Sequence, residues 1–152
     1  MQKCTLALGC FWKPEENFKN QPGIIDTEVG YAGGENANVT YDEVCKGDSG
    51  HAEVVRLSFD EKMVSYEKIL ELFFKLHDPT QKDMQFPDVG TQYRSEIFYE
   101  NESQKNLAFQ VKDSIESVRL TESRRIKLNE LHFFDHPLFG VILQVSRYET
   151  EE

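Results

Sequence analysis

The chain has 152 residues, of which 39% are hydrophobic and 12% aromatic, and its formal net charge at pH 7 is −10. This length fits one domain with a buried core, and the composition excludes a disordered chain. The acidic surface disfavours nucleic acids and anionic membranes as partners, because both attract clustered Lys and Arg. We therefore expect a single domain over residues 1–152, present as a monomer, with no nucleic-acid or membrane partner.

The number and spacing of the cysteines indicate the cellular compartment of the protein. Cys4, Cys10 and Cys45 are an odd number of cysteines and form no C-x-x-C pair, which argues against a disulfide scaffold and favours a reducing environment. No apolar run approaches the roughly 20 residues of a membrane span. The apolar part of the first ten residues is too short for a signal peptide and fits a first strand better. We expect a cytoplasmic protein.

The first half of the chain is predicted to alternate between strands and helices. Residues 3–8 alternate as a strand does, and a helix follows to about residue 20. A second strand is expected from residue 24, running into a glycine turn at Gly33 and Gly34, and a third at 51–60. The polar loop between them holds one helical turn at 41–45.

The second half is predicted to complete an α+β fold. Its elements are a helix at 65–77, a long loop at 79–93, a strand at 94–100, a helix from residue 101, and two weaker strand candidates, "RIKLNELHFF" and "GVILQVSRY". Ser65 suits the N-cap of the first helix, and a loop of this length is often functional. The order predicts a ferredoxin-like split βαβ sandwich with an extra C-terminal helix and loops.

Cys10 lies where the first strand turns into the first helix, after Gly9 and before Phe11 and Trp12. Backbone N–H groups and the helix dipole favour a thiolate at such a position, and the thiolate is the reactive form of cysteine. The alternative is a small buried hydrophobe, since cysteine is among the most buried residue types. The two aromatic residues fit either a core or the wall of an apolar pocket beside the sulfur.

Glu53 breaks the pattern of its strand. Alternation places it on the same face as Val55, Leu57 and Phe59. A carboxyl group on an apolar face should have a raised pKa, which suits a general acid. The alternative is that Glu53 stands at the end of the strand, where the face opens to water. The strand pattern alone leaves both interpretations open.

Two other motifs are set aside. "GDSGH" at 47–51 lacks the final glycine of a nucleophile elbow, and no histidine precedes Ser49 to act as its base. His132 and His136 have a spacing that metal ligands use, but no paired cysteines accompany them. We therefore expect no metal site.

Six segments together resemble the peptide methionine sulfoxide reductase type A family. They are "GCFW", "GYAGG", "TYDEVC", "GHAEVV", "HDPTQ" and "DVGTQYRS", in the order and spacing of that family, from about residue 6 to 109. Each segment is weak alone, and the combination is specific. The resemblance implies a single catalytic domain that reduces methionine-S-sulfoxide, free or in proteins, without a cofactor.

The resemblance also implies roles for individual residues. Cys10 attacks the sulfoxide sulfur, and Glu53 supplies a proton to the sulfoxide oxygen. Methionine leaves, and Cys10 remains as a sulfenic acid. The other implied site residues are Tyr41 and Tyr93, which hydrogen-bond the oxygen, Asp88, which helps set the site, and Phe11 and Trp12, which hold the methyl group of the substrate.

The sequence departs from the family in the residues that recycle the enzyme. Many members carry resolving cysteines and an aromatic-acidic segment near the C-terminus, and neither is present after Cys45. Cys4 lies about 20 Å along the strand from Cys10, beyond the roughly 7 Å that a disulfide allows, whereas Cys45 stays open as a partner. We expect a one-cysteine cycle with an external thiol such as thioredoxin, glutaredoxin or glutathione. The alternative is a redox-sensing protein of the same fold with poor turnover.

Overall fold

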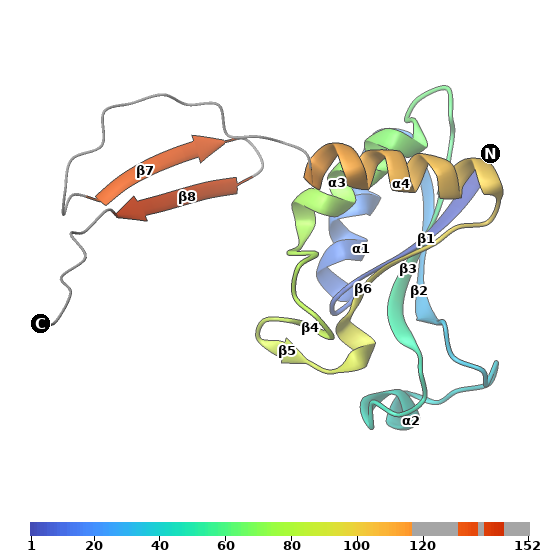
Figure 1. The fold of residues 1–152 in the computed structure, drawn as a ribbon. Coiled ribbons are helices and arrows are strands. Elements are labelled where there is room, and N and C mark those ends of the chain that lie inside the picture. Colours follow the sequence, from blue (N-terminus) through green and yellow to red (C-terminus); the bar gives the residue numbers. More distant parts are fainter. Residues whose placement is uncertain (117–130, 137–138, 145–152) are drawn as a thin grey trace, which may run out of the picture. The chain divides into compact units, whose positions relative to one another are not determined.

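The computed structural model describes the backbone of residues 1–116, 131–136 and 139–144, and side chains as far as residue 115. The chain groups into two compact units, Met1–Asp113 and Ser114–Glu152. The first unit combines helices with an antiparallel sheet (Figure 1), which confirms the α+β prediction.

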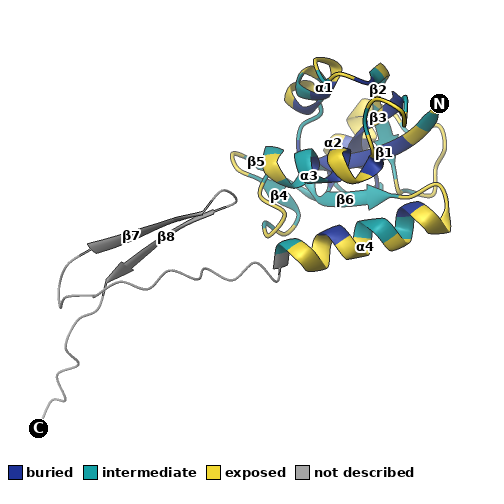
Figure 2. Ribbon diagram, turned by 90° about the horizontal axis from the view of Figure 1, so that it is seen from above, coloured by how far each residue is buried: buried dark blue, intermediate teal, exposed yellow. Residues whose placement is uncertain are grey.

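A four-stranded antiparallel sheet forms the centre of the first unit, in the order β2-β3-β1-β6 (Figure 1). Its strands are β1 (Gln2–Leu8), β2 (Ile24–Ala32), β3 (Ala52–Phe59) and β6 (Ser95–Phe98). The two central strands are largely buried on both faces (Figure 2), and their exposed residues are Lys3 near the start of β1 and Arg56 of β3. Pairing of Leu6 with Val55 and of Leu8 with Ser95 sets the register of β1 against both neighbours.

Helix α1 (Trp12–Lys19) contacts β2 and β3, and α3 (Tyr66–Leu76) contacts β1. The α3 sequence places its apolar residues at helical spacing, and four of them are buried: Tyr66, Ile69, Leu70 and Phe73. Ser65 Oγ accepts a hydrogen bond from Lys68 N at 3.2 Å, which confirms the predicted N-cap.

His77 ends α3 one residue earlier than the pattern predicts, because its backbone is extended. Its Nδ1 donates to the Phe73 carbonyl oxygen at 2.7 Å, and its Nε2 lies 2.7 Å from Ser95 Oγ. One side chain thereby satisfies a free carbonyl at the helix end and ties α3 to the start of β6. Helix α4 (Glu102–Glu116) follows β6 and is mostly exposed (Figure 2).

Two short elements interrupt the long loops. Helix α2 (Tyr41–Cys45) forms where one helical turn is predicted, and Thr40 caps it by exchanging hydrogen bonds with Glu43. The predicted loop 79–93 instead contains a hairpin of β4 (Met84–Gln85) and β5 (Asp88–Val89), followed by the 3-10 helix η1 (Thr91–Tyr93). Period-2 alternation cannot reveal strands of two residues.

In the second unit, β7 (Leu131–His136) and β8 (Phe139–Gln144) pair as an antiparallel hairpin. They overlap the two weaker strand candidates but extend past them, to His136 at the end of β7 and from Phe139 at the start of β8. The remaining residues of the candidates lie outside the described part of the chain. The side chains of His132 and His136 also lie outside it. Among the described helices, none has the length and apolar character needed to cross a membrane.

Candidate active site

Cys10 lies in the tight connection between β1 and α1. The backbone of Gly9 has φ +93°, which favours glycine, and a Cβ there would stand 2.9 Å from the side chain of Gln85. The connection therefore requires glycine for both its conformation and its close contact with β4. It leaves Cys10 half-buried at the start of the helix, with its thiol accepting a hydrogen bond from Trp12 N–H.

Glu53 lies on β3 with only 5% of its surface exposed. This favours the buried acid over a strand end that opens to water. Its Oε2 accepts a hydrogen bond from Phe11 N–H at 3.1 Å, and its carboxyl group is in hydrogen-bonding contact with the Cys10 thiol. The acid and the cysteine therefore share one polar cluster although they are far apart in the sequence.

Burial raises the pKa of Glu53 above its ordinary value, and the charge of Asp88 raises it further. The hydrogen bonds from Phe11 N–H and from the Cys10 thiol oppose this shift without cancelling it. The raised pKa agrees with the expectation from the strand pattern, and its main cause is the one that the pattern suggested, loss of solvent.

The pKa of Cys10 is also raised, which corrects the expectation of a thiolate favoured by the helix start. Burial is the largest cause, and the charges of Glu53 and Asp88 add to it. The Trp12 N–H does lower the pKa, as the helix position predicts, but its effect is outweighed. A helix start is a local feature, whereas the neighbouring carboxylates come from β3 and β5.

Tyr93 and Tyr41 lie within electrostatic reach of this cluster. Burial raises the pKa of Tyr93, and the charges of Glu53 and Asp88 add to the shift. Tyr41 is 62% exposed on α2, and a hydrogen bond with the Cys45 side chain is the main cause that raises its pKa to about 12. Tyr93 and Glu53 contribute to that shift as well, so both lie within electrostatic range of the Tyr41 hydroxyl group.

An aromatic wall stands beside the thiol. The rings of Phe11 and Trp12 meet edge to face with centroids 5.6 Å apart, and Trp12 is 71% exposed. Phe11 also contacts Tyr31, at a centroid distance of 6.0 Å. The wall is therefore open to solvent rather than part of the core, and an apolar group could lie against it.

Tyr31 is the site residue that the sequence interpretation missed. It pairs directly with Glu53 across β2 and β3, and Glu53 and Cys45 both contribute to raising its pKa after burial does. The available signal was the "GYAGG" segment, which matches the family but received no role. Its position opposite Glu53 depends on strand register, which that segment does not reveal.

The three cysteines differ in environment. Cys4 is fully buried in β1, and burial raises its pKa to about 12. Cys10 is half-buried, and Cys45 is exposed on α2 beside Tyr41. All three are free thiols. Because Cys4 is buried, only Cys10 and Cys45 are accessible to an oxidant or a partner thiol. No group of three or more potential metal ligands occurs among the described residues.

A family model described as peptide methionine sulfoxide reductase matches residues 2–136. This match defines the class of protein, an oxidoreductase. More particularly, the chain belongs to the peptide methionine sulfoxide reductase family.

Curated relatives carry the same description. The chain is 57% identical over 108 residues to peptide methionine sulfoxide reductase MsrA of Pelagibacter ubique, covering 71% of this chain and 74% of the relative. It is 44% identical over 152 residues to MsrA of Methanosarcina acetivorans, covering all of this chain and 74% of that one.

Solved structures of methionine sulfoxide reductases also match this chain. Mxr1 from Saccharomyces cerevisiae in reduced form superposes with a TM-score of 0.73 at 36% identity, covering 76% of this chain and 68% of that one. Methionine sulfoxide reductase A of Corynebacterium diphtheriae gives 0.71 at 35% identity, and this chain spans about half of its length, 54%, while 76% of this chain is covered. Mxr1 in complex with Trx2 also matches, with a TM-score of 0.55 at 26% identity, covering 76% of this chain and 66% of that one.

Proposed function

We propose that this chain reduces methionine-S-sulfoxide, free or in proteins, with Cys10 as nucleophile and Glu53 as acid. The observation that carries the proposal is the contact between the Cys10 thiol and the Glu53 carboxyl group, both with raised pKa. A sulfoxide oxygen leaves its sulfur only when it is protonated. A buried carboxyl group that holds its proton more tightly than usual is suited to supply that proton.

The reaction transfers one oxygen atom from substrate to enzyme. The Cys10 sulfur attacks the sulfoxide sulfur, Glu53 protonates the oxygen, and the oxygen ends on Cys10 as a sulfenic acid while methionine leaves. The sulfoxide is reduced by two electrons, and the cysteine is oxidised by two. Because the pKa of Cys10 is raised in the substrate-free protein, the thiol must lose its proton as the oxygen gains one, and the neighbouring carboxyl group is placed to carry it.

Polar residues bind one part of the substrate, the sulfoxide oxygen, and apolar residues bind another, the methyl group. Tyr41 and Tyr93 hydrogen-bond the sulfoxide oxygen, and Asp88 sets the site through its charge on Glu53 and Cys10. Phe11 and Trp12 hold the methyl group against their rings, of which the Trp12 ring is exposed and the Phe11 ring partly buried. A thioether has no oxygen to satisfy the two hydroxyl groups, so the product binds more weakly than the substrate.

An external thiol completes the cycle. It condenses with the sulfenic acid to form a mixed disulfide and water, and a second thiol releases Cys10. The burial of Cys4 and its pKa of about 12 support its exclusion from this step. The yeast relative solved in complex with Trx2, a thioredoxin, supports thioredoxin as the donor. Glutaredoxin and glutathione are the other candidates.

Four further expectations belong to the same proposal. The strand order β2-β3-β1-β6 supports the ferredoxin-like arrangement. The proposed site residues Cys10, Glu53 and Tyr93 all lie in the unit Met1–Asp113. The single catalytic domain over residues 1–152, the monomeric state and the cytoplasmic location stay predictions.

The test is turnover of a chromophore-labelled methionine sulfoxide with dithiothreitol, using the S and R diastereomers separately. We expect reduction of the S form only, loss of activity in Cys10→Ser, and retention in Cys45→Ser. Sulfenic acid at Cys10 without turnover would instead establish the redox-sensing protein.

A further inference from the structure

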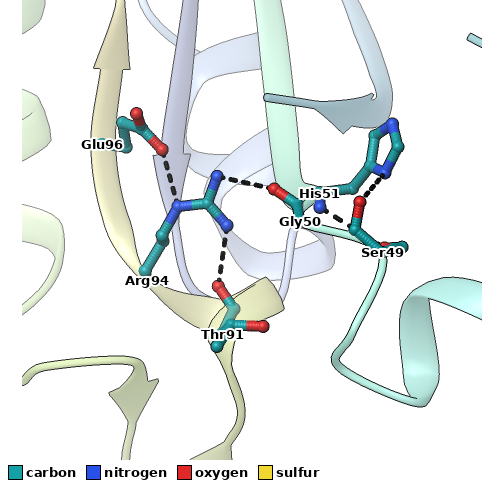
Figure 3. A network of polar contacts seen from close by, with 6 residues as sticks. All are labelled: Ser49, Gly50, His51, Thr91, Arg94 and Glu96. Atoms are coloured by element: carbon teal, nitrogen blue, oxygen red, sulfur yellow. Dashed lines mark hydrogen bonds and ion pairs between the residues drawn. The ribbon is translucent and has the colours of Figure 1, made fainter. Parts of the chain in front are cut away.

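The guanidinium group of Arg94 joins separate segments around the site, as Figure 3 shows. Its Nε donates to Glu96 Oε2 at 2.6 Å, its Nη1 to the Thr91 carbonyl oxygen at 3.0 Å, and its Nη2 to the Gly50 carbonyl oxygen at 3.1 Å. The Arg94 side chain is only 22% exposed. Each of its three nitrogens therefore has a partner, from β6, from η1 and from the residues just before β3.

The segments that Arg94 joins carry the proposed acid and one proposed oxygen ligand. Gly50 lies three residues before Glu53, and Tyr93 immediately precedes Arg94. In the sheet, β1 separates β3 from β6, and β1 pairs with β6 only as far as Leu8. Backbone pairing of neighbouring strands therefore does not connect η1 to the segment before β3. Two side chains make that connection: Arg94 through the Gly50 carbonyl oxygen, and Thr91, whose Oγ1 donates to the Gly47 carbonyl oxygen at 2.9 Å.

The backbone near the guanidinium group is constrained on two sides, at Gly33 and at residues 49–51. A Cβ on Gly33, at the end of β2, would stand 2.7 Å from Arg94 Nη2, and Gly33 has φ +92°. On the other side, buried His51 hydrogen-bonds the Ser49 carbonyl oxygen through Nδ1 at 3.1 Å, and its backbone N–H donates to Ser49 Oγ at 3.3 Å (Figure 3). The peptide that Arg94 contacts at Gly50 is thus held from both ends.

We propose that Arg94 is a positioning residue that sets the separation between the Tyr93 hydroxyl and the Glu53 carboxyl group. The inference rests on the proposed function, because those two groups must reach one sulfoxide oxygen. Arginine suits the task because its planar fork donates in three directions at once, whereas lysine offers one nitrogen at the end of a flexible chain. Loss of the fork should leave substrate binding by the aromatic wall intact and slow the chemical step.

The experiment compares Arg94→Lys and Arg94→Met with Arg56→Met in steady-state reduction of methionine-S-sulfoxide with dithiothreitol. Arg56 is the matched control, since it forms a 3.8 Å ion pair with Glu28 on the same sheet and is half exposed. We expect kcat to fall about 10-fold or more in both Arg94 variants, with KM changed less than about 3-fold, and no change in the control. Glu96→Gln removes one partner of the guanidinium at a partly exposed position, and we expect a smaller loss of kcat, about 2- to 5-fold.

A double-mutant cycle separates positioning from general destabilisation. If Arg94 acts through Tyr93, Arg94→Met should cost less than about 3-fold in kcat on a Tyr93→Phe background, although it costs about 10-fold alone. Equal costs on both backgrounds, or unchanged kcat in Arg94→Lys and Glu96→Gln, would overturn the inference. Failure of the wild-type chain to turn over would instead refute the proposed function.

Discussion

The backbone N–H of Phe11 donates a 3.1 Å hydrogen bond to Glu53 Oε2 and thereby holds the proposed acid beside Cys10. Phe11 immediately follows Cys10, so the turn that places the thiol also places a donor on the carboxyl group. The donor opposes part of the pKa increase that burial causes in Glu53. One turn thus helps to position Glu53 and offsets part of the pKa increase that burial causes.

Glu53→Gln tests the acid. Glutamine keeps the shape and can still accept the Phe11 N–H, but it cannot donate a proton to the sulfoxide oxygen. We expect kcat to fall by about 100-fold or more, measured with methionine-S-sulfoxide and dithiothreitol. Glu28→Gln on β2 is the control, because that carboxylate is exposed, and it should keep the wild-type rate. An unchanged rate in Glu53→Gln would show that another group supplies the proton.

The same substitution should change how stability depends on pH. A carboxyl group whose pKa is raised by folding binds protons more tightly in the native state, so it makes stability fall as pH rises from the unfolded pKa through the folded one. Glu53→Gln removes this loss. We expect its melting temperature to exceed that of the wild type at pH 8 and the difference to shrink below about pH 4, where both states hold the proton. A wild-type advantage that grows toward pH 8 would contradict the raised pKa.

The raised pKa of Cys10 predicts slow alkylation at neutral pH. Only the thiolate reacts with iodoacetamide, so the midpoint of the rate against pH should lie above that of a free cysteine. Glu53→Gln should lower the midpoint, because it removes a neighbouring negative charge. Peptide mapping distinguishes Cys10 from exposed Cys45. A Cys10 midpoint below that of free cysteine would mean that the helix start outweighs burial after all.

Gly9→Ala should damage the turn that carries Cys10, the proposed nucleophile. The added Cβ would stand 2.9 Å from the Gln85 side chain, in a backbone with φ +93°. We expect a loss of about 1–3 kcal/mol in the free energy of unfolding together with reduced activity. Gly30→Ala is the matched control in β2, since nothing lies within 4 Å of a Cβ there. Equal effects of the two substitutions in denaturant titrations would show that the Gly9 conformation is not required.

The one-cysteine cycle predicts the product of a single turnover without reductant. Intact-mass analysis should show a chain about 16 Da heavier, and dimedone should label Cys10 as a sulfenic acid. A chain about 2 Da lighter than the reduced form, with Cys10 joined to Cys45, would establish an internal disulfide instead. Cys45→Ser separates the two, because it should leave the dimedone adduct unchanged only in the one-cysteine cycle.

Much of the fold followed from spacing along the chain. Apolar residues at helical intervals with Ser65 before them located α3, and alternation around Glu53 located β3. The hairpin β4–β5 escaped because its strands have two residues each. The position of Glu53 on an apolar face was also visible in the pattern, because side chains of a strand alternate regardless of what surrounds them.

The sequence by itself determined where Cys10 stands, at a glycine turn into a helix, and which strand face carries Glu53. Only the tertiary structure decided the direction of the Cys10 pKa, the pairing of Tyr31 with Glu53, and the link from Arg94 to Gly50. Turns and alternation are set by neighbouring residues, so they can be recognised in the chain. Burial, charge and hydrogen bonding depend on residues that are distant in sequence, and they exist only once β1, β3 and β6 lie side by side.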